Sequence, residues 1–206
     1  QVKKHEKHRG GWRYQPGSRD SDISCTGWQL MSLRSARMNG ASIPDKSIKE
    51  AVAYVIRCRD HRAIAAAKKG KLKKGEGIGF CYQPGSSPGL ARTGTGVLCL
   101  ELCGRHRSRE SLAGADWILK HPARTVGSHY FYYGLYYCSQ AMFQVGGRHW
   151  EAFAPYMYEM MIKVQRKDGS WPQGKRGESK AGPCYSTAMG VLAMAVSYRQ
   201  LPIYQR

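Results

Sequence analysis

The sequence predicts an all-α fold of about four helix pairs, in which the pairs alternate with glycine-aromatic turns. Three observations predict it. A glycine-rich turn with a central aromatic residue recurs, an apolar segment with a threonine follows each turn after about 15 residues, and no stretch shows the period-two alternation of a strand. The turns cover Gly10–Gly17, Gly77–Gly85 and Asp168–Gly174, and their aromatic residues are Trp12, Phe80 and Trp171.

The recurring threonines are assigned to Thr26, Thr95 and Thr187, and a divergent fourth unit is expected at 129–140. A unit that cannot bury its own apolar face has to stack on copies of itself, so we expect a single repeat domain over 1–206. The turn at Trp12 should follow a helix, and no helix fits before it. We therefore expect the domain to be incomplete at its N-terminus, and any targeting signal to be missing from the chain.

Seven helices are expected, each with apolar residues at helical spacing and each bounded by capping or helix-breaking residues. In chain order the first ends at Asn39-Gly40, the second has Pro44 in its first turn, and the fourth follows Ser108 and stops before Pro122. The expected helices cover about 26–38, 44–56, 95–103, 108–120, 129–145, 150–165 and 185–198.

A basic insertion at 57–76 interrupts the repeat between the second and third helices. The segment Arg57–Lys74 contains eight lysines and arginines against one acid, Asp60, in a chain whose formal net charge is +19. Such a segment is expected to be an exposed excursion, with a short helix over 63–67 and a mobile loop. It would favour an anionic membrane surface or an acidic partner, and nucleic acid is a third, less favoured partner.

The seven cysteines are an odd number, and their spacing shows no framework of a small disulfide-rich domain. That usage favours a reducing compartment and free, packed thiols. Because 42% of the residues are hydrophobic, the chain is not of the disordered class.

The segment Gln165–Trp171 resembles the glutamine-to-tryptophan repeat of squalene–hopene cyclases and related terpenoid cyclases. The alternation of helices and turns resembles the wider α/α-toroid group, which includes protein prenyltransferase β subunits. It is similar in particular to bacterial proteins described as prenyltransferase and squalene oxidase repeat-containing. The resemblance implies a partial α/α toroid. It also implies that Gln165 and Trp171 tie neighbouring helices together, with Trp12 and Phe80 as the aromatic residues of incomplete copies.

The same resemblance makes Asp20 and Asp22 candidate catalytic residues. Squalene–hopene cyclases place Asp-x-Asp-Asp-Thr at a similar point, and the central aspartate protonates a carbon–carbon double bond. Alignment on Thr26 puts Asp22 on the first aspartate and leaves Ser24 and Cys25 at the central pair. The alternative is that Asp22 caps a helix, so that replacing it with asparagine costs less than ~1 kcal/mol.

An aromatic segment follows position 129. On a helix, Tyr133, Tyr136, Tyr137 and Gln140 share one side, and Tyr132 shares an adjoining side with Tyr136. Aromatic faces can line an apolar cavity and stabilise cations, and Trp28 of the first repeat is expected to face the same cavity. The alternative is ordinary packing, in which tyrosine hydroxyls bond to loop carbonyls.

No metal or cofactor is expected. The zinc ligands of protein prenyltransferases are aspartate, cysteine and histidine, and no histidine is suitably placed around Cys184. Two function classes follow. The first is a non-catalytic scaffold or binder of an isoprenoid-type ligand or a protein partner. The second is an enzyme acting on a polyprenyl or triterpene substrate, which the missing acid pair disfavours.

Overall fold

The computed structural model describes residues 5–198, and these residues form eight α-helices, two short 3-10 helices and no strand. The all-α prediction is therefore confirmed. The helices are α1 (Ile23–Met38), α2 (Asp45–Arg57), α3 (His61–Lys68), α4 (Leu90–Leu102), α5 (Arg109–Lys120), α6 (Phe131–Val145), α7 (Gly147–Val164) and α8 (Gly182–Met194). The 3-10 helices cover Glu6–His8 and Ala195–Tyr198.

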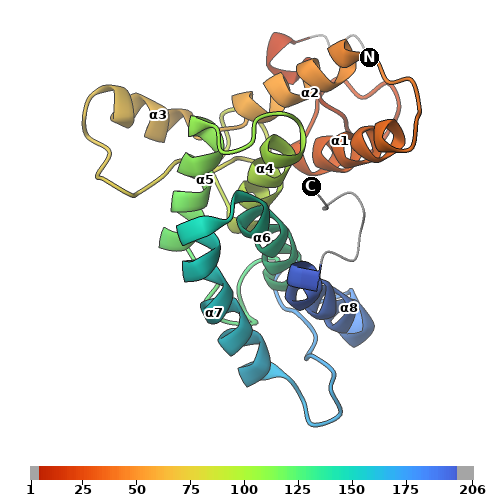
Figure 1. Ribbon diagram of the computed structural model, residues 1–206, viewed down its shortest axis with the longest axis vertical. Helices are drawn as coiled ribbons and strands as arrows, with labels where there is room; N and C mark the ends of the chain where they lie inside the picture. Colours follow the sequence, from red (N-terminus) through yellow and green to blue (C-terminus); the bar gives the residue numbers. More distant parts are fainter. Residues whose placement is uncertain (1–4, 199–206) are drawn as a thin grey trace.

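The helices form two layers (Figure 1). In the inner layer α1 packs on α4, α4 on α6, and α6 on α8. In the outer layer α2 covers α1 and α4, α5 covers α4 and α6, and α7 covers α6. Each inner helix follows a turn and each outer helix returns the chain, which is a helical-repeat arrangement. Closure into a toroid stays a prediction.

The glycine-aromatic turns share one hydrogen bond. The backbone N–H of Trp12 donates to Thr26 Oγ1 at 3.0 Å, that of Phe80 to Thr93 Oγ1 at 3.0 Å, and that of Trp171 to Thr187 Oγ1 at 3.1 Å. The repeated threonine of the second unit is therefore Thr93, and the assignment to Thr95 is wrong. Helix α4 begins at Leu90, five residues earlier than the sequence predicted: two residues come from this shift, and three arise because the helix begins before its threonine, as α1 does before Thr26.

Local signals explain the other boundaries. Asp22 caps α1 by accepting the N–H of Cys25 at 2.9 Å, and Ser108 caps α5 by accepting that of Ser111 at 3.3 Å. Such caps each stabilise a helix by about 1 kcal/mol. Gly146 has a φ of 68° and separates α6 from α7, where most other residues would be strained.

Helix α3 and the loop after it project from the two layers (Figure 1). No residue of α3 is buried, and Asp60 caps the helix by accepting the N–H of Arg62 at 2.9 Å. The short helix expected near 63–67 is confirmed. This segment, the basic arm (residues 57–76), starts at the buried Cys58, and its exposed residues are concentrated between positions 61 and 75.

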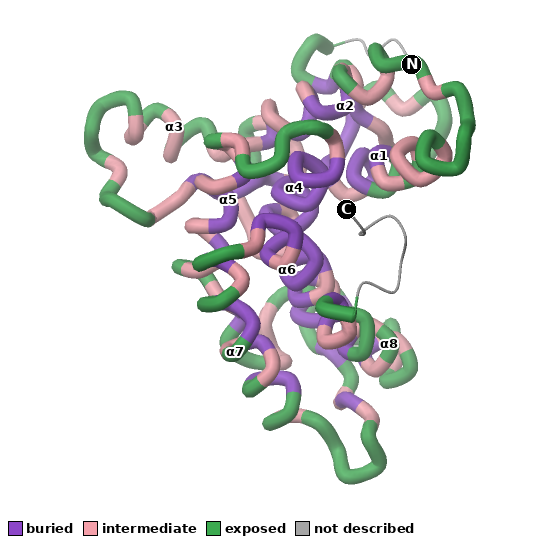
Figure 2. The backbone as a smooth tube through the Cα atoms, viewed as in Figure 1, coloured by how far each residue is buried: buried purple, intermediate pink, exposed green. Residues whose placement is uncertain are grey.

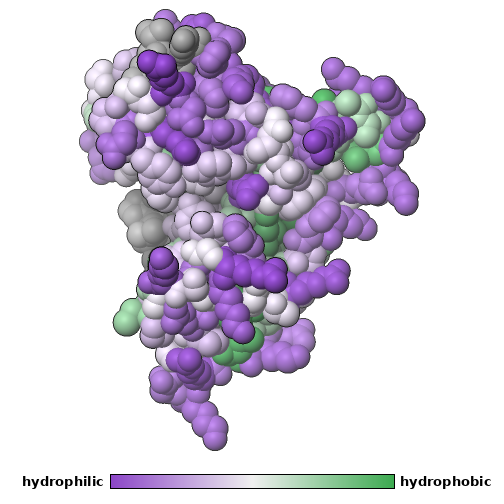
Figure 3. Space-filling view, turned by 180° about the vertical axis from the view of Figure 1, so that it is seen from behind, coloured by the Kyte–Doolittle hydropathy of each residue, from purple (hydrophilic) through white to green (hydrophobic). Residues whose placement is uncertain are grey.

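The buried residues run along the inner layer (Figure 2). Leu98, Leu135 and Met142 are among the fully buried side chains of α4 and α6, the two helices with the most extensive mutual packing. On the face of the molecule that is turned away in Figure 1, hydrophilic residues cover most of the surface (Figure 3). None of the helices within residues 5–198 combines the length and apolar character that a membrane span requires.

Candidate functional site

A cavity of about 790 Å³, here called the aromatic cavity, lies between the four inner helices. It receives Ser24 and Trp28 from α1, Ala91 and Arg92 from α4, and Tyr185, Met189 and Leu192 from α8, while α6 supplies three tyrosines. The turns before these helices supply further walls. The aromatic residues that line it are Tyr14, Trp28, Tyr82, His129, Tyr130, Tyr133, Tyr136, Tyr137 and Tyr185.

The tyrosines of α6 form a continuous row of rings. The ring centroids of Tyr133 and Tyr137 lie 4.7 Å apart, and those of Tyr136 and Tyr137 lie 4.9 Å apart at 76°. Tyr130 extends the row toward the N-terminus of α6, with its centroid 6.3 Å from that of Tyr133. Tilted and edge-on pairs of this kind are favourable beyond the area that they bury.

One wall of the cavity contains a small cluster of polar atoms, from Trp28, Tyr133 and Tyr137. Trp28 Nε1 donates to the hydroxyl of Tyr137 at 2.7 Å, which joins α1 to α6 across the cavity. The hydroxyl of Tyr133 is buried and has no partner with hydrogen-bond geometry among the described residues. Burial raises the pKa of both tyrosines, so both hydroxyls stay protonated near neutral pH. The cavity therefore offers an apolar wall with a hydroxyl donor or acceptor in it.

Glu178 carries the buried charge of the cavity. It is 2% exposed, and its Oε1 and Oε2 accept the backbone N–H groups of Tyr133 at 2.8 Å and of Tyr132 at 3.2 Å. These amides belong to the first turn of α6, whose N-cap residue Tyr130 makes no side-chain cap. A carboxylate is stabilised at a helix N-terminus, so Glu178 caps α6 from a distant segment.

The candidate acids converge on one arginine at the edge of the cavity. Arg13 Nη1 donates to Asp22 Oδ2 at 2.8 Å, and Arg13 Nε lies 3.4 Å from Asp20 Oδ2. The same guanidinium bonds to the hydroxyl of Tyr82 at 2.6 Å and lies over the rings of Tyr14 and Tyr82. The bond to Asp22 is the main reason why the pKa of Arg13 is raised.

Neither acid is arranged to donate a proton. Asp22 is fully buried, does not line the cavity, and uses one oxygen for the N–H of Cys25 and the other for Arg13. Asp20 is partly exposed, and the hydrogen bond from Gln83 Nε2 lowers its pKa. The expected small cost of Asp22→Asn also needs correction. That substitution weakens a buried charge-assisted bond, which typically contributes about 1.5–3 kcal/mol.

The structure brings four of the predicted cavity residues together and separates two. Trp28, Tyr133, Tyr136 and Tyr137 line the cavity. Tyr132 is fully buried beside Phe131, and its hydroxyl donates to the carbonyl of Pro172 at 2.7 Å. Gln140 is buried away from the cavity. Their prediction as lining residues is therefore corrected: Tyr132 is directed to Pro172, and Gln140 shares the side of Tyr133 and Tyr137 but lies beyond the end of the cavity.

The repeat residues also differ in their roles. Trp171 is 4% exposed, and its Nε1 donates to the carbonyl of Met161 in α7 at 2.9 Å. Gln165 is exposed and donates to Gly169 inside its own turn at 2.9 Å, so it does not reach a neighbouring helix. The bridging function therefore rests on Trp171. Phe80 is fully buried, and Trp12 is half-buried.

Residues 5–198 contain no group of three or more histidines, cysteines and acids that could hold a metal ion. All seven cysteines lie in this range and are free thiols. Cys184, at the start of α8, is exposed, whereas Cys99 is packed in the core, where burial raises its pKa well above the usual value.

Sequence reasoning missed Glu178, Arg13 and Tyr185. Glu178 stands in a polar loop with no pattern around it, so nothing in the sequence marks it as a cap for α6. Tyr185 could have been found, because it stands in the first turn of a helix that follows a repeat turn, as Ser24 does in α1. Comparison with models of protein families and with curated proteins finds no match for the chain.

Proposed function

We propose that this chain is a terpenoid-cyclase-like and prenyltransferase-like repeat domain that binds an apolar, isoprenoid-type ligand in the aromatic cavity without transforming it. The observation that carries the proposal is the cavity itself, which has a volume of about 790 Å³, is lined by all four inner helices and draws aromatic walls from α1, α6 and α8. Small-molecule sites typically occupy ~300–1,000 Å³ and are mostly apolar with a few polar groups.

The lining favours a long apolar ligand with one polar end. The faces of the α6 tyrosines, together with Met189 and Leu192, supply apolar contact. The hydroxyl of Tyr133 is buried beside Trp28 and Tyr137 without a partner among the described residues, and a single ligand oxygen that enters between these rings would supply one. A polyprenyl alcohol has this combination, so farnesol is a suitable probe.

Leu192→Arg is expected to weaken farnesol binding at least about tenfold, a loss of ~1.4 kcal/mol. Leu192 lines the cavity and is 39% exposed, so the substitution removes apolar contact and places a charge beside the ligand. Isothermal titration calorimetry measures the change. The matched control is Val191→Arg, because Val191 is the preceding residue of α8, is 51% exposed and does not line the cavity.

The control should bind farnesol as the wild type does. Equal affinities of the two variants, or wild-type protein that neither binds farnesol nor releases an isoprenoid on lipid extraction, would contradict the proposal.

An enzyme acting on a polyprenyl or triterpene substrate is the second candidate. It is favoured by the aromatic faces and by Arg13, whose guanidinium already lies 5.4 and 5.5 Å from the ring centroids of Tyr14 and Tyr82. Rings that accept one cation can stabilise a carbocation in the same way. It is disfavoured by the engaged oxygens of Asp22.

Wild-type protein incubated with squalene or with polyprenyl diphosphates is expected to yield no cyclised product. The reason is that alkene protonation requires a protonated carboxyl group that faces the substrate, whereas both oxygens of Asp22 accept hydrogen bonds within the protein. Product analysis by mass spectrometry is the measurement, with Asp22→Asn alongside. A product that forms with the wild type and disappears with Asp22→Asn would favour the enzyme.

The basic arm extends the proposal to a partner. Six of its eight lysines and arginines stand on α3 and the projecting loop after it and are exposed, whereas Arg57 and Arg59 lie at the base of the arm with buried Nε atoms. We propose that the arm attracts an anionic surface, either acidic lipid head groups or an acidic protein, and brings the aromatic cavity to it. Nucleic acid is disfavoured because no phenylalanine, tyrosine or tryptophan stands among these cations for base stacking.

A further inference from the structure

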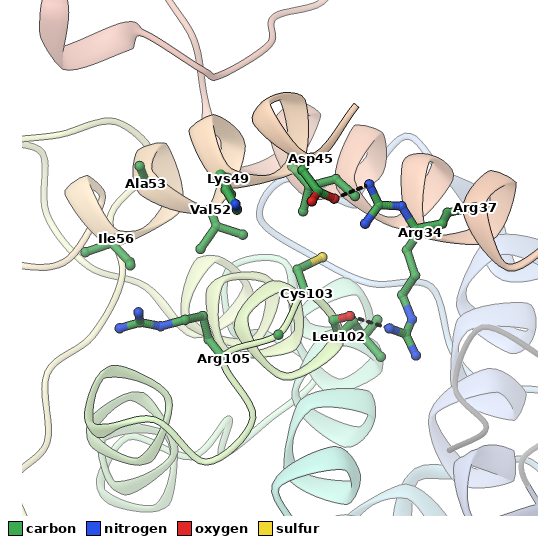
Figure 4. A pocket seen from close by; sticks show the side chains of 12 residues that line it. Arg34, Arg37, Asp45, Lys49, Val52, Ala53, Ile56, Leu102, Cys103 and Arg105 are labelled. Atoms are coloured by element: carbon green, nitrogen blue, oxygen red, sulfur yellow. Dashed lines mark hydrogen bonds and ion pairs between the residues drawn. The ribbon is translucent and has the colours of Figure 1, made fainter. Parts of the chain in front are cut away.

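A second cavity, here called the basic pocket, lies between α1, α2 and the C-terminal end of α4 (Figure 4). Its volume is about 570 Å³, and it shares no lining residue with the aromatic cavity. The function proposed above makes no use of it.

The floor of the basic pocket is apolar. Ile48, Val52 and Ile56 recur every four residues along α2 and so form one stripe of that helix. Leu102 and Cys103 meet this stripe from the end of α4. Val52 and Leu102 are buried, but Ile48, Ile56 and Cys103 are only half-buried. Among the described residues nothing covers this partly open apolar strip.

The rim is cationic. Arg34, Arg37, Lys49 and Arg105 surround the floor, and Asp45 is the one acid of the lining. Asp45 pairs with Arg37 at 2.8 Å, and Arg105 pairs with Glu110, outside the lining, at 3.1 Å. Lys49 forms no ion pair within the described residues. The lining therefore keeps an excess of positive charge around an apolar floor.

The orientation of the side chains fits a ligand that has one anionic part and one apolar part. In Figure 4 the sulfur of Cys103 points toward the Arg37–Asp45 pair, and Lys49 lies on the same side of the opening. Arg34 donates to the carbonyl of Leu102, so it covers one acceptor at the negative end of α4. An anionic group at the opening would face Lys49 and Arg37, while its apolar part would lie along α2.

We propose that the basic pocket binds a single-chain anionic amphiphile, with its apolar chain on the α2 stripe and its anionic head group beside Lys49 and Arg37. A pocket of about 570 Å³ lies in the ~300–1,000 Å³ range of small-molecule sites. A helix ~10 Å across would fill it with little more than one turn, which disfavours a helical peptide. The head group is a carboxylate or phosphate, carried by a soluble amphiphile or by a membrane lipid.

Cys103 provides a reporter within the pocket. Burial raises the pKa of its thiol to about 11, although Arg34 and Arg37 oppose the shift. Cys184 is the other thiol that is not buried, so the experiment uses a Cys184→Ser background. The rate of Cys103 alkylation by N-ethylmaleimide is measured at pH 8.5 by mass spectrometry, with and without dodecyl phosphate below its micelle concentration.

Dodecyl phosphate is expected to slow the alkylation of Cys103 at least about fivefold, a ~1 kcal/mol effect on occupancy. Dodecyltrimethylammonium, which carries the opposite charge, should not slow it. Lys49→Glu should abolish the protection, whereas Lys46→Glu should keep it, because Lys46 is an exposed residue of α2 outside the lining. Phosphatidylserine vesicles form a separate arm: protection by vesicles identifies a membrane source, and protection by dodecyl phosphate alone identifies a soluble one.

Lack of protection by both anionic probes, equal protection by the cationic probe, or protection that survives Lys49→Glu would overturn the proposal. Calorimetric titration with dodecyl phosphate repeats the comparison independently of thiol reactivity. Farnesol binding to the aromatic cavity should be the same in Lys49→Glu and in the wild type, so the two sites can fail separately.

Discussion

Trp171→Ala is expected to lower the free energy of unfolding by about 3–5 kcal/mol, the usual cost of removing a large buried aromatic side chain. Trp171 is 4% exposed and joins two helices, because its indole N–H binds Met161 of α7 and its backbone N–H binds Thr187 of α8. Its ring also packs against Gly190 of α8. Urea denaturation followed by far-ultraviolet circular dichroism measures the change.

Trp150→Ala is the control. Trp150 is half-buried in the first turns of α7, where its ring centroid lies 5.2 Å from that of Phe143, and within residues 5–198 no hydrogen bond of its indole joins it to another element. Its loss should cost about 1–2 kcal/mol, since it buries less surface. Equal destabilisation by the two substitutions would contradict the bridging role of the turn.

Gly94→Ala should separate α4 from α6, the two inner helices with the most extensive packing. A Cβ at position 94 would lie 2.8 Å from the backbone nitrogen of Cys138 and 2.9 Å from the carbonyl carbon of Tyr137. Backbone atoms cannot move aside as a side chain can, so a net loss of about 1–3 kcal/mol is expected from overpacking. Thermal denaturation should show the loss as a lower melting temperature.

Gly134→Ala is the matched control within α6. Its Cβ would approach no atom closer than 3.6 Å, which is ordinary van der Waals contact. Alanine also favours the helix over glycine by up to about 1 kcal/mol, so this variant should be as stable as the wild type or more stable. The close approach of α4 and α6 would be refuted if Gly94→Ala were as stable as Gly134→Ala.

The helices and turns could be predicted because their signals are local. Ser108 caps α5 as expected, and the turn aromatics each lead into an inner helix. The register of the second unit, in contrast, could not be predicted from local signals. Thr93 and Thr95 both stand in an apolar helical segment, and only the hydrogen bond to the N–H of Phe80 distinguishes them.

The aromatic cavity could be predicted in part. Helical spacing places Tyr133, Tyr136 and Tyr137 on one side of α6, and these three line the cavity. The same spacing includes Gln140, which is buried elsewhere, because spacing does not say where along the helix a cavity ends. Tyr132 is turned to Pro172 by a hydrogen bond with a segment 40 residues away.

The basic pocket, like the aromatic cavity, could be predicted only in part from the sequence. The stripe from Ile48 to Ile56 predicts an apolar face of α2, and the ordinary expectation for such a face is burial in the core. The structure leaves Ile48 and Ile56 half-buried and places Arg105 near them from the loop after α4. That juxtaposition depends on how α2 and α4 cross.

The sequence by itself determined the all-α class, the repeated turn, the basic arm and the aromatic side of α6. These features depend on capping, on glycine conformations and on side-chain period, which act over a few residues. Only the tertiary structure decided that Glu178 caps α6, that Arg13 engages Asp20 and Asp22, and that Trp28 meets Tyr137. The contacts of Glu178 and Trp28 join segments whose approach is set by the packing of whole helices, which leaves no short-range pattern in the chain. The contacts of Arg13 depend on how the loop before α1 folds back, with the N–H of Asp22 donating to the carbonyl of Trp12.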